Sequence, residues 1–472
     1  MDNKTEAIID LLLNGHNVFL FGMGGAGKTY CARAVADYFD EYGWRVARTG
    51  STGIAALNLR VNKQTDVGGK STNETNTPDS TRAPDGDGTE STKTLGVSTL
   101  HRWAGIGLAR GSAETLLEGV RSYSIARANW TCTDLLIIDE ISMIGGELWE
   151  KLDYIGRHIR EEHEKAFGDL RIMIIGDFMQ LPPVKDKWVF LTESWIDTDF
   201  KTFVFNKPMR YPDLKWYEML KRIRIGKQNV QDMRELRTRK DAYKKIKNEL
   251  TEVDVKPTIL YSKKVDVRQH NQVELDKLQY EKYVFYASDS FTQFKSRKNK
   301  NIDIDREHYR TMINDCIPEI IELKIGAQVM LKHNLCPDEG LVNGSRGVVT
   351  DIKKSPSGQD IVTVKFINGL EMEIKAHEWD YVNEYGRLTR SQIPLILAWS
   401  LTIHKVQGCT LDYVVVDLGP SVFACGQAYV ALSRARSLEG LFLSEVFNTS
   451  IKCDKVALKY SQYLEQNGIK ME

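Results

Sequence analysis

The chain has 472 residues and a mass of 53.8 kDa, with 42% hydrophobic and 27% charged residues. This length exceeds what one hydrophobic core usually holds, so we expect two or more domains. Lysine and arginine (64) balance aspartate and glutamate (64), so the net charge neither indicates nor excludes a nucleic-acid partner. No apolar run approaches the roughly 20 residues that cross a bilayer, and the N-terminus lacks the basic and apolar regions of a secretory signal. We therefore expect no membrane segment.

The seven cysteines are scattered, and no two of them stand at Cys-x-x-Cys spacing. This arrangement argues against a zinc or thioredoxin-type site and indicates reduced thiols. We expect a soluble intracellular protein, and the sequence does not distinguish nucleus, mitochondrion, bacterial cytoplasm and virus-infected cytoplasm.

Short apolar runs alternate with stretches of helical period in the first half of the chain. The runs are Asn17–Phe21, Arg45–Thr49, Leu135–Asp139 and Arg171–Asp177. Between the last two runs, apolar residues recur at four- and three-residue steps from Leu148 to Ile159, as on one face of an amphipathic helix. Strands that alternate with helices predict an α/β fold with a parallel sheet.

The second half of the chain has a further set of strands and a region of different character. Strands are expected at Pro257–Ser262, Tyr413–Leu418 and Leu441–Val446. Residues 323–374 instead hold short alternating runs, broken by Asn-Gly or Ser-Gly dipeptides at 343–344, 357–358 and 368–369. Such dipeptides are typical of tight turns, so we expect a small β-barrel or sandwich inserted in this half.

Residues 62–94 are dominated by polar side chains, with only Val67 and Ala83 apolar. Such a segment cannot bury enough apolar surface to offset the entropy of ordering it. We expect a surface insertion without fixed structure, and the alternative is a flexible arm that touches nucleic acid.

Residues 22–29 read GMGGAGKT and fit the phosphate-loop pattern GxxxxGK[ST] in full. They follow an apolar strand and precede a helical pattern, which is the context that this pattern requires. The backbone positions expected to surround phosphate oxygens are Gly22, Gly24, Gly25, Ala26 and Gly27. We expect Lys28 to reach the β- and γ-phosphates and the Thr29 hydroxyl to hold Mg²⁺.

Two later strand ends carry polar groups that suit the same chemistry. Leu135–Asp139 ends in a pair of carboxylates, of which Asp139 should hold Mg²⁺ and Glu140 should orient and deprotonate the attacking water. In GDFMQLPPV, at residues 176–184, Gln180 either senses the γ-phosphate or belongs to a simple turn. These elements alone do not separate a helicase from a kinase or a transporter ATPase.

Two blocks near the C-terminus narrow the choice: TIHKVQGCTLD at residues 402–412 and QAYVALSRA at residues 427–435. They resemble the last motifs of superfamily-one helicases, most closely the Pif family, whose relatives include phage Dda and bacterial RecD. STGIAA at 51–56, STLH at 98–101, GDFMQLPPV, and LVNGSRGV at 341–348 fit the same family. The blocks keep the family's order and cover about residues 17–447, so the resemblance spans most of the chain.

The resemblance implies two RecA-like parallel-sheet domains with a nucleotide between them, a small SH3-like insertion (2B) and a small wedge insertion (1B). On this basis domain 1A would span residues 1–200, with the wedge and the polar segment at 60–100. Domain 2A would span 201–279 and 393–472, and domain 2B would span 280–392.

The resemblance also assigns residues from the second domain to the nucleotide. Arg434 matches the family's arginine finger, and Arg210, in PMRY at 208–211, matches a second one. The family usually has glutamine where Tyr211 stands, so the match at Arg210 is less close. Gln407 and Gly408 would link the nucleotide to the nucleic-acid track. Many relatives read adenine with a glutamine before the phosphate loop, but residues 1–16 contain none, so other nucleoside triphosphates are expected to serve as well.

Positions that match the family's nucleic-acid contacts follow several of these motifs. They are Thr52, His101, Asn343, Thr402, His404 and Lys405. Their side chains suit phosphate contacts that do not read bases, as a translocating motor requires. The alternative for His101 and His404 is a buried structural histidine, and Trp103 either stacks on a base or belongs to the core. Basic runs at 234–247 and 295–300 either line a phosphate track or form a solvated helix face and a loop.

The predicted function is that of an ATP-dependent DNA helicase that uses ATP and Mg²⁺, moves 5′-to-3′ on single-stranded DNA as the family implies, and opens forked DNA. We expect a monomeric motor that replication or repair proteins recruit. An RNA helicase on the same motor is the first alternative, because backbone contacts discriminate poorly between the two nucleic acids. A scaffold with a vestigial ATPase and a small-molecule kinase are the others, and either would turn over ATP without regard to nucleic acid.

Overall fold

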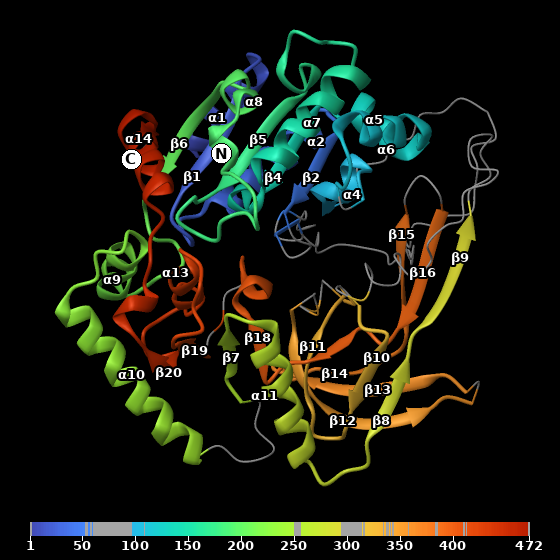
Figure 1. Cartoon of the computed structure of the whole chain (residues 1–472), viewed down its shortest axis with the longest axis vertical. Coiled ribbons are helices and arrows are strands. Elements are labelled where there is room, and N and C mark those ends of the chain that lie inside the picture. The colour runs from blue at the N-terminus through green and yellow to red at the C-terminus, as the bar shows by residue number, and fades with distance from the viewer. Residues whose placement is uncertain are drawn as a thin grey trace, which may run out of the picture.

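The computed structural model describes residues 2–51, 55–56, 59, 97–107, 109–249, 256–293, 314, 317–333, 335–336, 339, 341, 344–356, 358–382, 386–408, 411 and 413–470. Two parallel sheets and a group of antiparallel strands make up this part of the chain (Figure 1). The polar tract at 62–94, the basic run at 295–300, Thr52 and Asn343 lie outside the described residues. Within the described ranges, every helix is too short or too polar to traverse a lipid bilayer.

The first sheet has the strand order β21-β6-β1-β5-β4-β2-β3, and each neighbouring pair is parallel. Its strands are β1 (Asn17–Gly22), β2 (Val46–Gly50), β3 (Ser98–Thr99), β4 (Leu135–Asp139), β5 (Arg171–Gly176), β6 (Phe200–Phe205) and β21 (Ile469–Lys470). The four strands predicted for this half are confirmed as β1, β2, β4 and β5, each within one residue at either end. β6, β3 and β21 were not predicted.

Helices cover both faces of this sheet. One face holds α1 (Asn3–Leu13) and α2 (Lys28–Glu41), and the other holds α4 (Leu100–Ala104), α5 (Ala113–Ser122), α6 (Ser124–Cys132) and α7 (Gly146–Ile159). Val18 and Leu20 of β1 pack on the first face, whereas Phe19 and Phe21 pack on the second. Burial on both faces explains why these strands read as continuous apolar runs rather than as alternating ones.

The second sheet has the order β18-β7-β19-β20, and its strands are parallel. They are β7 (Thr258–Tyr261), β18 (Ser400–Thr402), β19 (Val414–Leu418) and β20 (Leu441–Val446). Its helices are α9 (Leu214–Arg224), α10 (Val230–Glu249), α11 (Lys264–Lys277) and α13 (Gln427–Leu432). Residues of α9, α13, β7 and β19 share one core, which makes α9 and α13 part of the second domain.

The expected domain division is wrong at two places. Residues 201–205 were assigned to the second domain but lie in β6 of the first sheet. Residues 393–472 were also all assigned to the second domain, but α14 (Lys455–Asn467) and β21 pack on the first. β21 pairs with β6, and the Trp195 Nε1 donates a hydrogen bond of 2.8 Å to the Tyr460 hydroxyl. The Tyr460 ring stacks on Phe190 at 4.1 Å. The chain therefore crosses back to the first domain, and α14 lies beside β6 in Figure 1.

The antiparallel strands lie between α11 and β18 in sequence. They are β8 (Tyr283–Tyr286), β9 (Ser288–Gln293), β10 (Ile320–Leu323), β11 (Gln328–Leu331), β12 (Arg346–Lys354), β13 (Asp360–Phe366), β14 (Glu371–Ile374), β15 (His377–Val382), β16 (Gly386–Gln392) and β17 (Leu395–Leu397). They form the groups β10-β8, β14-β13-β12-β11-β17 and β15-β16-β9. β17 pairs with β11, so the insertion runs past its expected end at residue 392. The predicted turn at Asn368 and Gly369 joins β13 to β14.

Candidate active site at the domain seam

The phosphate loop connects β1 to α2, as its sequence pattern requires. Gly22, Gly24, Gly25, Ala26 and Gly27 form its backbone. A Cβ atom at Gly22 would lie 2.1 Å from the Phe205 carbonyl oxygen, so no other residue fits where the loop leaves the sheet. Gly27 caps α2 with a φ of 88°, a left-handed conformation that glycine adopts without strain. The N-terminus of α2 therefore points into the loop, where its dipole favours an anion.

The Lys28 ammonium group spans this loop. Its Nζ donates hydrogen bonds to the carbonyl oxygens of Gly22 (2.6 Å) and Met23 (2.8 Å). Burial lowers the pKa of Lys28, and the nearby carboxylates of Asp177, Glu140 and Asp139 oppose that shift. The loop thus holds a buried cation beside backbone amides, an arrangement that suits the phosphates of a nucleotide.

Asp139 and Glu140 follow β4 at the same edge of the sheet. The Thr29 hydroxyl donates a hydrogen bond of 3.2 Å to Asp139, and the Glu140 amide donates one of 2.7 Å to the same carboxylate. Burial, together with the charge of Glu140, raises the pKa of Asp139 to about 7. A divalent cation held by Thr29 and Asp139 would offset both effects, and hydroxyl and carboxylate oxygens are the ligands that Mg²⁺ prefers. The donor set therefore fits Mg²⁺.

Gln407 of the second domain contacts Glu140 and Gln180 of the first. The Gln407 amide, from the second domain, donates hydrogen bonds to Glu140 (3.1 Å) and to the Gln180 side-chain oxygen (3.3 Å). All three residues are buried. Residues 177–180 do form a turn, closed by a hydrogen bond of 3.0 Å from the Gln180 amide to the Asp177 carbonyl oxygen, and the Gln180 side chain also contacts Gln407. Gln407 thus contacts the predicted catalytic carboxylate directly.

Both predicted arginine fingers lie against the phosphate loop. The Arg434 Nη2 lies 3.6 Å from the position that a Cβ atom on Gly24 would take. The backbone amides of Met209 and Arg210 both donate to the Gly25 carbonyl oxygen, at 2.9 and 3.0 Å. The second domain therefore places the Arg434 guanidinium and the backbone and side-chain stem of Arg210 beside the loop that carries Lys28.

Tyr211, which replaces the family's glutamine, is a structural residue of the seam. Its hydroxyl donates a hydrogen bond of 3.0 Å to the Ser433 carbonyl oxygen, and the Arg210 Nη1 donates to the same oxygen at 3.3 Å. Tyr211 is buried. It ties the chain segment of Arg210 to the turn that carries Arg434.

Three further residues belong to the site and were not assigned from the sequence: Asp177, Arg224 and Tyr429. The Arg224 guanidinium forms an ion pair of 2.7 Å with Asp177, and Tyr429 donates a hydrogen bond of 3.3 Å to that carboxylate. Asp177 stands directly after β5, as Asp139 ends β4, so its position at the sheet edge was a signal. No local pattern distinguishes Arg224 from the other basic residues of α9.

The described nucleic-acid candidates divide between the two domains. Thr402 ends β18, and His404 and Lys405 follow it in a 3-10 helix at residues 403–406. His101 lies in α4 of the first domain. Burial lowers the pKa of both histidines, with Lys264 adding to the effect at His404, and so favours the neutral form of each imidazole. A neutral imidazole still donates a hydrogen bond to a phosphate oxygen.

Two of the open alternatives are decided by packing. Trp103 belongs to the core: it is 3% exposed, its ring lies 4.6 Å from that of Trp130, and its Nε1 donates to Thr133 at 3.3 Å. Base stacking by Trp103 is therefore excluded in this conformation. The basic run at 234–247 lies on α10, where Arg239 donates to backbone carbonyl oxygens next to β20 and Lys240 pairs with Glu445 at 2.7 Å. These contacts favour the helix-face alternative.

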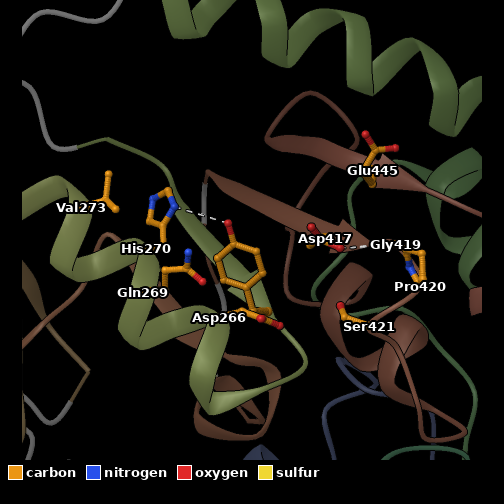
Figure 2. A pocket seen from close by; sticks show the side chains of 10 residues that line it. Asp266, Gln269, His270, Val273, Asp417, Gly419, Pro420, Ser421 and Glu445 are labelled. Carbon is orange, nitrogen blue, oxygen red and sulfur yellow. Dashed lines mark hydrogen bonds between the residues drawn. The ribbon is translucent and has the colours of Figure 1, made fainter.

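A cavity of about 450 Å³ lies elsewhere, at the carboxyl ends of β7 and β19 (Figure 2). Its lining includes the carboxylates of Asp266, Asp417 and Glu445 beside Tyr261 and His270. Three carboxylates would repel a triphosphate, and no phosphate-loop residue reaches this cavity. The nucleotide site is therefore the seam and not this cavity.

A phosphate loop with two acids on one parallel-sheet domain, completed by an amide and two arginines from another, defines the class of two-domain P-loop nucleoside triphosphatases. The sequence profile of the PIF1-like helicase family matches residues 2–67 and 88–238, and that of the DNA helicase Pif1 2B domain matches residues 312–352. The chain belongs to the PIF1-like helicase family.

Individual relatives agree with this assignment. The chain is 32% identical over 485 aligned positions to the ATP-dependent DNA helicase PIF1 of Rattus norvegicus. The alignment covers 100% of this chain but only 66% of that relative's length. Among solved structures, it is similar to Pif1 helicase from Candida albicans at 28% identity and a TM-score of 0.78, covering 98% of this chain and 99% of that one. Pif1 from Bacteroides sp. in complex with ADP-AlF4, at 24% identity and a TM-score of 0.66, covers 100% and 99% and shares the fold.

Proposed function

We propose that this chain is an ATP-dependent DNA helicase, which hydrolyses ATP at the seam of its two parallel-sheet domains and uses the cycle to move along single-stranded DNA and open duplexes. One observation carries the proposal. Side chains of the second domain, Gln407, Arg210 and Arg434, reach the phosphate loop and the carboxylate of the first. Family membership and the names of the relatives support the same conclusion.

The chemical step follows from the positions of these side chains. A water molecule attacks the γ-phosphorus, Glu140 accepts its proton, and the bond to the β-phosphate oxygen breaks to leave ADP and phosphate. Lys28, Arg210 and Arg434 stabilise the negative charge that spreads over the γ-phosphoryl oxygens. When bound at Thr29 and Asp139, Mg²⁺ would neutralise charge on the β- and γ-phosphates.

The link from hydrolysis to movement is short in sequence and in space. Gln407 contacts Glu140. The predicted contacts to single-stranded DNA are at Thr402, the last residue of β18, and at His404 and Lys405, which follow it. Closure of the seam on ATP and its release after hydrolysis would therefore shift these contacts relative to those of the first domain. We expect 5′-to-3′ movement by a monomer, as the family resemblance implies.

Two substitutions test the site. We expect Lys28→Ala and Glu140→Gln to abolish DNA-stimulated ATP turnover, because one removes the buried cation of the loop and the other the base. Matched controls are Lys165→Ala and Glu147→Gln, which change exposed groups of the same domain. Turnover that is undiminished in both site variants would refute the proposal.

The polynucleotide is tested separately, with forks that carry single-stranded tails of either polarity and with poly-dT against poly-U as activators. The proposal predicts unwinding from the 5′ tail and stronger stimulation by poly-dT. Equal or stronger stimulation by poly-U would favour an RNA helicase on the same motor, and ATP turnover that ignores both would favour the scaffold or the kinase.

A further inference from the structure

A buried polar network lies behind the phosphate loop and crosses the domain seam. Asp177 is fully buried, and the Arg224 Nε and Nη2 both donate to it, at 3.0 and 2.7 Å. The Nη1 of the same guanidinium donates to Glu465 of α14 at 3.1 Å, and the group lies 5.7 Å over the Phe21 ring. Asp177, Phe21 and α14 belong to the first domain, whereas Arg224 ends α9 of the second.

This ion pair is therefore a fixed point of the seam. Burial opposes the charge on Arg224, but Asp177 outweighs that effect and raises the pKa of the guanidinium. Removing either partner would leave an uncompensated buried charge, which proteins tolerate poorly. The ion pair consequently holds the two domains together at Asp177.

Tyr429 extends the network to the loop itself. Its hydroxyl donates to Asp177 at 3.3 Å and accepts a hydrogen bond of 3.1 Å from the Gly24 amide. Burial, with Asp177 adding to the effect, raises the pKa of Tyr429 well above its usual value, so the hydroxyl keeps the proton it donates. One oxygen atom thus serves both as donor and as acceptor, a role that phenylalanine cannot fill.

Arg434 directly follows the C-cap of the helix that contains Tyr429. Tyr429 lies in α13, and the Arg434 Nε donates to the Val430 carbonyl oxygen of that helix at 2.8 Å, while its Nη2 donates to Ser433 at 2.8 Å. The guanidinium is therefore fixed to α13, and Tyr429 is the hydrogen-bonded contact between α13 and the loop amide. Where the helix sits decides where the guanidinium sits.

We propose that Tyr429 and Arg224 are positioning residues. Through their contacts with Asp177, they hold the Arg434 guanidinium at its place beside the phosphate loop. The inference rests on the proposed ATPase function. It assigns neither residue a contact with the reacting atoms. Tyr429 sets the distance between finger and loop, and Arg224 holds the carboxylate to which Tyr429 is bonded.

The test removes one oxygen atom. We expect Tyr429→Phe to lower the kcat for ATP about tenfold, which is the scale of one hydrogen bond to a charged partner, with KM and thermal midpoint little changed. Tyr261→Phe is the control, since that hydroxyl bonds to His270 at 3.4 Å beside the cavity of Figure 2, away from the loop. Arg224→Lys keeps the charge but loses the forked geometry, and we expect the same kcat defect in a milder form.

A double substitution separates positioning from general damage. If Tyr429 acts through the finger, Tyr429→Phe should cost nothing further in a chain that already carries Arg434→Ala. Losses that multiply in the double variant, or an unchanged kcat in Tyr429→Phe alone, would overturn the inference. A wild-type chain whose ATP turnover ignores DNA would instead refute the proposed function, and the positioning test would then be read on the basal turnover.

Discussion

The segment that carries Arg210 approaches the phosphate loop most closely at Gly25. Replacing Gly25 with alanine adds one methyl group and tests this contact. Gly25 has a φ of 82°, and a Cβ atom there would lie 2.7 Å from the Arg210 Cβ and 3.0 Å from the Tyr211 ring. An L-residue in this conformation costs about 1–2 kcal/mol. The contact also forces Arg210 to move, because the amides of Met209 and Arg210 are bonded to the Gly25 carbonyl oxygen.

The expected loss follows from that displacement. A shift on the order of 1 Å in a catalytic group can cost about 100-fold in rate, so we expect Gly25→Ala to lower the DNA-stimulated kcat about 10- to 100-fold. Gly43→Ala, outside the phosphate loop, is the matched control. Gly43 has a φ of 80°, so alanine is strained there as at Gly25, but no atom lies within 4 Å of the position its Cβ would take. We expect that variant to stay within about threefold of wild type.

Steady-state ATPase assays with saturating poly-dT measure kcat and KM for both variants, and binding of a fluorescent ATP analogue shows whether the loop still accepts nucleotide. Equal kcat values for the two variants would refute the argument, because they would mean that the Gly25 contact with Arg210 does not exist in the working enzyme.

Three further predictions concern packing and pH. Trp103→Ala should lower the free energy of unfolding, measured by denaturant titration, by about 3–5 kcal/mol, because the ring lies in the core. The affinity of the folded variant for single-stranded DNA should change less than about threefold. A stable variant that binds DNA weakly would contradict this prediction. Deletion of residues 455–472 should lower the thermal midpoint by about 5–10 °C, because α14 packs on Trp195 and Phe190 of the first domain. An unchanged midpoint would mean that the packing of α14 contributes nothing to stability. The His333 and His377 rings stack at 3.5 Å, and burial together with His333 lowers the pKa of His377 to about 4 from 6.5. The folded chain therefore binds fewer protons than the unfolded chain, and the stability contributed by His377 is complete above about pH 6.5 and is lost as the pH falls towards 4. His377→Gln should lose less thermal stability between pH 7 and pH 5 than wild type, and an equal loss would refute the assignment.

The parts of the fold that could be predicted are those that local chemistry determines. β1, β4 and β5 are buried on both faces and therefore appear as uninterrupted apolar runs. The phosphate loop needs glycine where backbone approaches backbone, as Gly22 does at Phe205. The family resemblance added what no local pattern contains, namely that Arg434, about 400 residues away in the sequence, lies beside Gly24.

What could not be predicted depends on contacts between distant segments. β21 is two residues long, and it is a strand only because β6 offers a free edge to it. Arg224 is one of several basic residues near the end of α9, and only the fold brings it to Asp177. Trp103 stands two residues after His101, a predicted nucleic-acid contact, yet its ring packs on Trp130 inside the domain.

The proposed hydrolysis requires guanidinium groups of the second domain at a triphosphate that the first domain holds. Single-turnover hydrolysis of ATP in the presence of single-stranded DNA, compared between wild type and Arg434→Ala, tests this most directly. An arginine finger contributes about 10³-fold or more to the chemical step, so we predict a loss of that size with the Kd for ATP nearly unchanged. Because Arg434 is buried, thermal unfolding of the variant is measured alongside to show that it is folded. Hydrolysis within about tenfold of wild type by the folded variant would contradict this assignment, because the γ-phosphate would then be stabilised without the Arg434 guanidinium.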